Sequence, residues 1–151
     1  MKIEDIIKTN SPMAIEKKTM LNILYTQNLI SEKFNEVLKR YDLSPEQFNV
    51  LRILKGQNGK STNMCVIQER MIAKTSNTTR LVDKLLLKEL VTREICPDNR
   101  RKMEIAITQK GLDLLTEVNP KVEKHESLFV QTLTPEELEQ LNTLLEKLRT
   151  I

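Results

Sequence analysis

The stretch that decides the fold is TSNTTRLVDKLLLKELVTREICPDNRRKMEIAITQKG, at residues 75–111. Residues 76–88 have the apolar period of a helix, with one face formed by Leu81, Val82, Leu85 and Leu86. Two runs rich in β-branched residues, 91–96 and 103–107, flank a Pro-Asp-Asn sequence and predict a β-hairpin. A helix followed by a hairpin and a new helix is typical of a winged helix-turn-helix, in which the hairpin is the wing.

The segments before this stretch predict further helices. The apolar period of residues 13–41 predicts one long helix, with Ser11-Pro12 at its start. Ser44 and Gln47 form a capping box for a helix at 45–55. A polar loop then leads to a short helix at 63–71, which with the helix at 76–88 completes the helix-turn-helix.

The segment after the hairpin also predicts helices. Thr108 caps a long helix in which Pro120 is expected to cause a kink or a break. Thr134 to Glu137 is a second capping box, and the helix after it carries leucines at coiled-coil spacing. Apolar stripes on the terminal helices of both ends exceed what one small domain can bury, so we expect a homodimer.

The expected architecture is therefore mainly α with a small β-hairpin wing. Residues 43–107 form the winged helix-turn-helix core, and residues 1–42 and 108–151 form a helical dimerisation region intertwined with it. Only 3 glycines in 151 residues agree with a helical chain.

The positive charge of the chain is concentrated in the same stretch. Residues 74–102 contain eight basic and four acidic residues, so this segment carries +4 while the whole chain carries +3. Positive charge gathered on a helix and a hairpin predicts binding to a polyanion, and the hairpin favours double-stranded DNA. A solvated helix face of an ordinary bundle is the alternative.

Particular side chains of this stretch are expected to contact DNA. Short polar side chains at the helix start allow close approach to phosphates, and Asn77 and Arg80 have the donors that pair with adenine and guanine edges. Basic residues in the turn of the hairpin are suited to a narrow minor groove. The predicted DNA-binding residues are Thr75, Ser76, Asn77, Thr79, Arg80, Lys84, Arg100, Arg101 and Lys102. Asp98 is expected to order the wing rather than touch DNA.

The run RLVDKLLLKELVTREICPDNRRKMEIAITQKG resembles the MarR family of winged-helix regulators. Arg80 to Asp83 match the helix motif, Arg100 and Arg101 match the wing, and Thr108 with Gly111 match the following helix start. The resemblance implies a dimeric repressor joined through its terminal helices, with recognition helices in successive major grooves. It also implies a small-molecule or redox signal that changes half-site spacing.

This sequence departs from the family pattern at three positions. Glu89 stands where the family often has glycine after the recognition helix, Ile72 stands where the turn often has glycine, and Asn99 replaces the aspartate before the wing arginines. The role of that carboxylate would fall to Asp98.

Two other functions remain as alternatives. The first is a thiol-based redox sensor, because Arg93 lies three positions before Cys96 and a nearby cation favours a thiolate; Cys65 is expected to be half buried. The second is a winged-helix interaction module without DNA binding. An enzyme is not expected, since His125 is the single histidine and no metal-ligand spacing, cofactor loop or nucleophile motif is present.

The compartment is predicted from what the chain contains. It has no apolar run of membrane-spanning length and no signal-peptide pattern, and its two cysteines make no disulfide framework. We expect a cytoplasmic protein that binds no metal and no cofactor.

Overall fold

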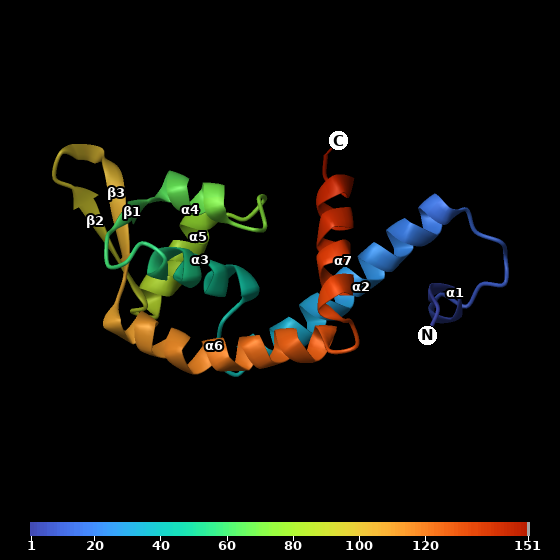
Figure 1. Cartoon of the computed structure of the whole chain (residues 1–151). Helices are drawn as coiled ribbons and strands as arrows, with labels where there is room; N and C mark the ends of the chain where they lie inside the picture. Colours follow the sequence, from blue (N-terminus) through green and yellow to red (C-terminus); the bar gives the residue numbers. More distant parts are fainter. Residues whose placement is uncertain (151) are drawn as a thin grey trace.

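The computed structural model describes residues 1–150, and these form seven helices and one small sheet (Figure 1). The mainly helical winged helix-turn-helix expected from the sequence is confirmed. The elements in chain order are α1 (Ile3–Ile6), α2 (Ile15–Lys39), α3 (Pro45–Lys55), β1 (Thr62–Asn63), α4 (Met64–Arg70), α5 (Thr78–Leu87), β2 (Val91–Cys96), β3 (Asn99–Ile107), α6 (Gln109–Val130) and α7 (Pro135–Leu148).

The helices α3, α4 and α5 gather beside the hairpin at one end of the molecule (Figure 1). The long helix α6 runs from the base of the hairpin to the other end, where it meets α2, and α7 stands upright beyond that crossing. The core lies between α3, α5, β3 and α6. Its fully buried side chains include Leu51, Leu54, Val82, Leu85, Ile105 and Leu115.

The capping boxes predicted for α3 and α7 are confirmed. The Ser44 hydroxyl accepts a hydrogen bond from the Gln47 backbone N–H (3.1 Å), and the Gln47 side chain accepts one from the Ser44 N–H (3.2 Å). Thr134 and Glu137 make the same reciprocal pair at the start of α7. Each pair satisfies two N–H groups that a helix start leaves without backbone partners, so local sequence sets these boundaries.

The sheet contains the predicted hairpin and one further strand. β2 and β3 pair antiparallel, and the two-residue β1 pairs with the other edge of β3, giving the order β1-β3-β2. The strand β1 was not predicted, because two residues carry no readable period. It becomes a strand only because Thr62 lies opposite Ile105.

The two long helices differ from the prediction at the start of α2 and at Pro120, where no break occurs. The long N-terminal helix begins at Ile15 with Ala14 at the N-cap, so Ser11 and Pro12 lie in the preceding segment. α6 continues through Pro120 without a break and bows gently (Figure 1). Proline removes one backbone hydrogen bond, and the buried side chains of Leu115, Val118 and Val122 on either side keep the helix packed.

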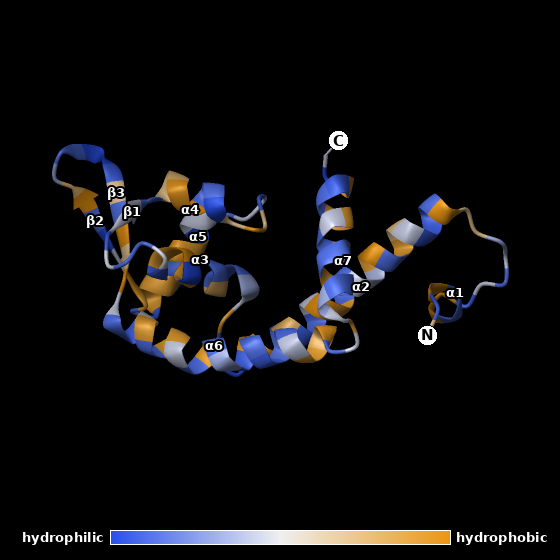
Figure 2. Ribbon diagram, viewed as in Figure 1, coloured by the Kyte–Doolittle hydropathy of each residue, from blue (hydrophilic) through white to orange (hydrophobic). Residues whose placement is uncertain are grey.

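Apolar side chains remain unburied on the terminal helices. In Figure 2 hydrophobic positions follow α2 and α7 outside the core, and α7 has no buried residue. The exposed members are Ile15, Met20, Leu24, Tyr25 and Ile30 on α2, Leu128 on α6, and Leu141, Leu144 and Leu148 on α7. Such a surface is typical of an interface between subunits. Among residues 1–150, no helix combines the length and apolarity needed to cross a membrane.

The end of α5, the end of β3 and the start of α6 meet at one junction. Glu89 takes a left-handed conformation (φ 60°), which ends α5 with bonds from the Glu89 N–H to Leu86 O and from the Leu90 N–H to Leu85 O. The Leu90 carbonyl then accepts the Thr108 N–H (3.1 Å). Glu89 stands where the family often has glycine, and the C-terminal cap of α5 is therefore a Schellman motif formed without glycine.

Glycine is required at position 111 in this junction. Gly111 is buried, and a Cβ there would lie 2.4 Å from the Leu90 carbonyl oxygen and 2.7 Å from Ile107 Cγ1. The first turn of α6 can approach the end of α5 only because this atom is missing.

We predict that Gly111→Ala destabilises the protein. Alanine gains about 1 kcal/mol of helix propensity, but overpacking against backbone costs about 1–3 kcal/mol, so the free energy of unfolding should fall by about 1 kcal/mol. Chemical denaturation would measure it. Gly56→Ala is the control, because the nearest atom to its Cβ is 3.3 Å away and its φ is −64°. A Gly111→Ala protein as stable as this control would contradict the packing argument.

Candidate nucleic-acid interface

The helix-turn-helix consists of α4, the turn at 71–77 and α5. Val82 and Leu85 of α5 are fully buried against the core, and Leu81 and Leu86 pack partly against it. The opposite face exposes Thr79, Arg80, Asp83 and Lys84, so the predicted division of this helix into a dry and a polar face is confirmed.

Hydrogen bonds from α3 and α4 hold the turn before α5. Thr78 is buried and its hydroxyl donates to Gln68 Oε1, while Gln68 Nε2 donates to the Lys74 carbonyl (2.9 Å). The Asn49 side chain accepts the N–H of Ile72 (3.0 Å). Sequence reasoning missed Gln68 and Asn49, because their partners are 10 and 23 residues away in the chain.

The structure places the predicted polar residues at the start of α5 as follows. Thr75, Asn77 and Thr79 are exposed and Ser76 is half-buried. Asn77 is the N-cap, and its Oδ1 accepts the N–H of Arg80 (3.1 Å). The helix therefore begins at Thr78 rather than at residue 76. The cap occupies the oxygen of Asn77, and its amide NH₂ remains for an external acceptor.

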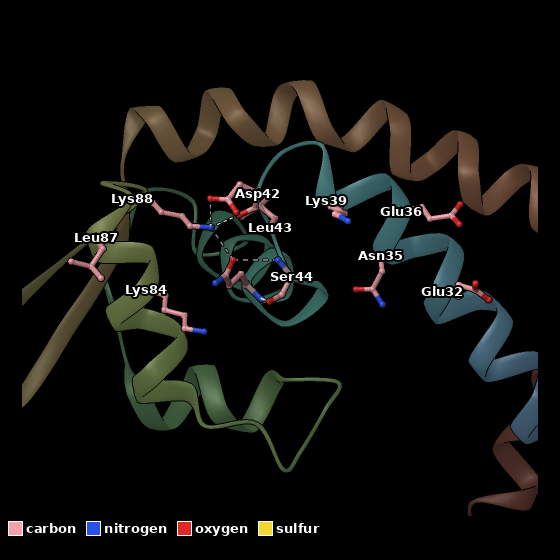
Figure 3. Close-up of a pocket in the computed structure, with 11 residues that line it drawn as sticks. Glu32, Asn35, Glu36, Lys39, Asp42, Leu43, Ser44, Lys84, Leu87 and Lys88 are labelled. Atoms are coloured by element: carbon pink, nitrogen blue, oxygen red, sulfur yellow. Dashed lines mark hydrogen bonds and ion pairs between the residues drawn. The ribbon is translucent and has the colours of Figure 1, made fainter.

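The cations of the recognition region divide into free and engaged side chains. Arg80 and Lys84 are exposed, and their side chains make no hydrogen bond or ion pair with any part of the chain that the structure describes. Arg93 instead bonds Asp83, with 2.6 Å between Nη1 and Oδ1, and so joins β2 to α5. Lys88, one turn after Lys84, instead points toward Asp42 (Figure 3) and also bonds Gln47.

The sequence predicted the three basic residues of the wing in the turn of the hairpin, but the structure places them in β3. Cys96 lies opposite Asn99 and Ile95 lies opposite Met103, so Arg100, Arg101 and Lys102 have no counterpart on β2. They form a bulge, and all three are exposed. A bulge twists the strand and changes the direction of its side chains. Figure 2 shows this end of the hairpin as hydrophilic.

The hydrogen bond that orders this bulge comes from Asn99. Its Oδ1 accepts the N–H of Arg101 (3.0 Å). Asp98, which we predicted to order the wing, is exposed and makes no side-chain bond within residues 1–150. The Asn99 side chain therefore orders the wing in place of Asp98, because its oxygen reaches a backbone N–H two residues further along the chain.

The two cysteines are free and lie in different surroundings. Cys96 is half-buried at the end of β2, whereas Cys65 is exposed on α4 and not half buried as predicted. The Arg93 guanidinium is engaged with Asp83. The cation that the redox alternative assigned to Cys96 is thus paired with another side chain.

A cavity of about 960 Å³ lies between the long helices and the helix-turn-helix. Its lining comes from α2, α3 and α6 and from residues 70–73, at the turn before α5. His125 is stacked on Phe34 (ring centroids 6.1 Å apart, planes at 23°) and lies 6.1 Å from Phe129. Arg52 and Arg70 add two cations to the wall. The sequence did not reveal this aromatic group, because Phe34 and His125 lie on different helices.

The lining is partly aliphatic and partly aromatic. Met71 contributes to the cavity, while Tyr25 is exposed elsewhere and Tyr41 packs against the core. Phe34, Phe48 and Phe129 form its aromatic part. Their convergence depends on the crossing of α2 and α6, which periodicity within either helix does not reveal.

The capping role of Asn77 leads to a prediction. Asn77→Ala should lower the free energy of unfolding by about 1 kcal/mol, whereas Asn77→Ser keeps a cap and should stay close to the wild type. Both variants lose the amide, so both should lose affinity for DNA to the same extent if that amide contacts DNA. Thermal unfolding and a DNA titration separate the effects, and a Ser variant as unstable as Ala would contradict the cap.

Comparison with known proteins agrees with this geometry. The MarR family model matches residues 43–103. The uncharacterized HTH-type transcriptional regulator YpoP of Bacillus subtilis (strain 168) is 32% identical over 143 residues, covering 94% of this chain and 97% of its own.

Two solved structures share the fold. An organohalide-sensing transcriptional regulator in its 2,4-dichlorophenol-bound form superposes with a TM-score of 0.83 at 20% identity, covering 93% of this chain and 85% of its own. The MepR–DNA complex of S. aureus gives a TM-score of 0.73 at 23% identity, covering 83% and 92%. The matched family consists of DNA-binding regulators and not of enzymes, and its members bind DNA as dimers. The chain belongs to the MarR family of DNA-binding transcriptional regulators.

Proposed function

We propose that two copies of this chain bind one pseudo-palindromic operator and repress transcription. In each copy α5 enters a major groove and the β2–β3 hairpin reaches the neighbouring minor groove, with half-sites about one helical turn apart. The observation that carries this proposal is the set of cations on α5 and in the wing bulge that have no internal partner within the described chain. These are Arg80 and Lys84 on α5 and Arg100, Arg101 and Lys102 in the wing bulge.

The spatial relation of these two elements supports the proposal. The Asp83–Arg93 pair joins α5 to β2, so the helix and the hairpin are presented together. The same pair neutralises Asp83, the one carboxylate on the exposed face of α5. Thr75, Ser76, Asn77 and Thr79 lie at the positive end of the helix dipole, where a phosphate is favoured.

The subunit interface is proposed to lie on the terminal helices, in residues 1–42 and 108–151. Burial of the exposed apolar side chains of α2, α6 and α7 would remove them from water, which contributes roughly 25 cal/mol per Å². Residues 43–107 would then remain free for DNA. We place the regulator in the cytoplasm, with the DNA it controls.

The cavity beside His125 is proposed to hold a small aromatic effector with an acidic group. Phe34, His125 and Phe129 supply flat surfaces, and Arg52 and Arg70 supply cations. The fold relative with bound 2,4-dichlorophenol supports a ligand of this size. Since residues 71–73 line both the cavity and the turn before α5, an occupant would act on the recognition helix.

The two alternatives are less well supported. A redox sensor needs a cation for the Cys96 thiolate, and Arg93 is paired with Asp83. An interaction module without DNA binding would have no use for unpaired cations on both α5 and the wing.

We expect binding to a selected operator to weaken steeply with salt. Each lost phosphate contact should reduce the slope of log affinity against log salt by about 1. Arg100→Ala should weaken binding to all duplexes, and Arg80→Ala should in addition relax sequence preference. Fluorescence anisotropy at several salt concentrations is the measurement. Lys124→Ala, an exposed cation on α6, is the control and should change nothing. Affinity that does not vary with salt would refute the mechanism.

We expect 2,4-dichlorophenol and benzoate, used as probes, to raise the unfolding temperature and to weaken operator binding. A ligand at 100 times its Kd stabilises by about 2.7 kcal/mol. Phe129→Ala should reduce the shift for both probes, and Arg70→Gln should reduce it mainly for benzoate. If neither probe changes the unfolding temperature of the wild-type protein, this class of effector is excluded.

A further inference from the structure

We propose that Lys88 is a positioning residue that sets the angle between the recognition helix α5 and the long helix α2, and thereby the operator spacing that a dimer accepts. The group consists of Lys88, Asp42 and Gln47, and is called the Lys88 clamp below. The inference rests on the proposed function, because spacing has meaning only when two copies bind one duplex.

The bonds of the clamp use the whole ammonium group. Lys88 Nζ donates to the Asp42 carbonyl, lies 3.1 Å from the Asp42 carboxylate Oδ2 and donates to Gln47 Oε1 at 3.3 Å (Figure 3). An ammonium has three N–H donors, and these three acceptors account for all of them. Lys88 is therefore directed toward the corner between α2 and α3, and its three donors are engaged within the chain.

The clamp joins α5 to the corner where α2 becomes α3. Asp42 has a left-handed φ of 53° at this corner, and the Leu38 carbonyl at the end of α2 accepts the N–H groups of Tyr41 (2.9 Å) and Leu43 (3.3 Å). Gln47 is buried, and its Oε1 also accepts the Ser44 N–H. The acceptors of Lys88 are thus held in place by α2 and α3.

Beyond the clamp, α5 and α2 are separated by an open cleft. The cleft has a volume of about 860 Å³ and extends from Lys84 and Leu87 on α5 to Glu32 and Glu36 on α2 (Figure 3). Leu87 is 86% exposed, so it makes no packing contact that would fix the helix there. The clamp lies at one end of this cleft and links α5 there to the corner between α2 and α3.

A change in that angle moves the two recognition helices of a dimer relative to each other. Their separation must match about 34–36 Å along the duplex. A dimer with a fixed angle accepts one spacing, and a dimer without the clamp accepts several. Lys84, one turn earlier on α5, is the natural comparison, because it is exposed and unpaired within residues 1–150.

The test uses duplexes that the wild-type protein selects from a random library, together with versions carrying one base pair more or less at the centre. For Lys88→Met, we expect the preference for the selected spacing to fall about tenfold, equivalent to about 1.4 kcal/mol. The salt slope should remain unchanged. Lys84→Met should reduce the slope by about 1 and keep the spacing preference. Asp42→Gly, which suits the left-handed backbone, removes the carboxylate and should also weaken the preference.

The outcomes separate the two proposals. If Lys88→Met lowers the salt slope and keeps the spacing preference, Lys88 is a phosphate contact and the positioning role is wrong. If both Lys88→Met and Asp42→Gly keep the preference, the clamp does not set the spacing. A wild-type protein that binds no duplex at low salt would instead refute the proposed function. Should Lys88→Met not fold, Asp42→Gly decides the question by itself.

Discussion

The approach of the first turn of α6 to the end of α5 constrains the rest of this structure. The Leu90 carbonyl accepts the Thr108 N–H, and its oxygen lies 2.4 Å from the place that a Cβ on Gly111 would take, so the two backbones meet without a side chain between them. The Thr108 hydroxyl, which caps α6, also donates to the Glu89 carbonyl (2.8 Å). The recognition helix, the hairpin and the long helix α6 therefore share one rigid joint.

Polar contacts hold α5 at three further places. Arg93 holds the outer face of α5 to β2 through Asp83, and Gln68 holds the turn before it through Thr78. Lys88 holds its far end to the corner between α2 and α3. Each contact uses a basic or polar side chain that the composition would assign to the surface. On α5 and the wing, the cations without a partner in the described residues are Arg80, Lys84, Arg100, Arg101 and Lys102, and these are the proposed DNA contacts.

A cavity and a cleft lie at the two ends of α5. The cavity borders the turn before α5, and the cleft borders its last turn. Both are lined by α2, which carries unburied apolar side chains at its other end. Two helices of the proposed subunit interface, α2 and α6, therefore also line the proposed effector cavity.

The sequence by itself determined the class of fold and the family. The capping boxes at Ser44 and Thr134, the apolar face of α5 and the two β-branched runs are local features, and each depends on residues within a few positions. Local patterns also indicated which segment would be basic. The start of α2, the continuity of α6 through Pro120 and the strand β1 were not predictable, because distant packing decides them.

The tertiary structure decided which charged side chains are free. In the sequence, Arg93 and Lys88 belong to the same basic segment as Arg80 and Lys84. In the structure, Arg93 pairs with Asp83, 10 residues away, and Lys88 pairs with Asp42, 46 residues away. The bulge that holds Arg100, Arg101 and Lys102 follows from pairing with β2, and the aromatic group around His125 follows from the crossing of α2 and α6. Local propensity reads neighbours along the chain, whereas the pairing of charges and the lining of cavities depend on contacts that form only when separate elements pack.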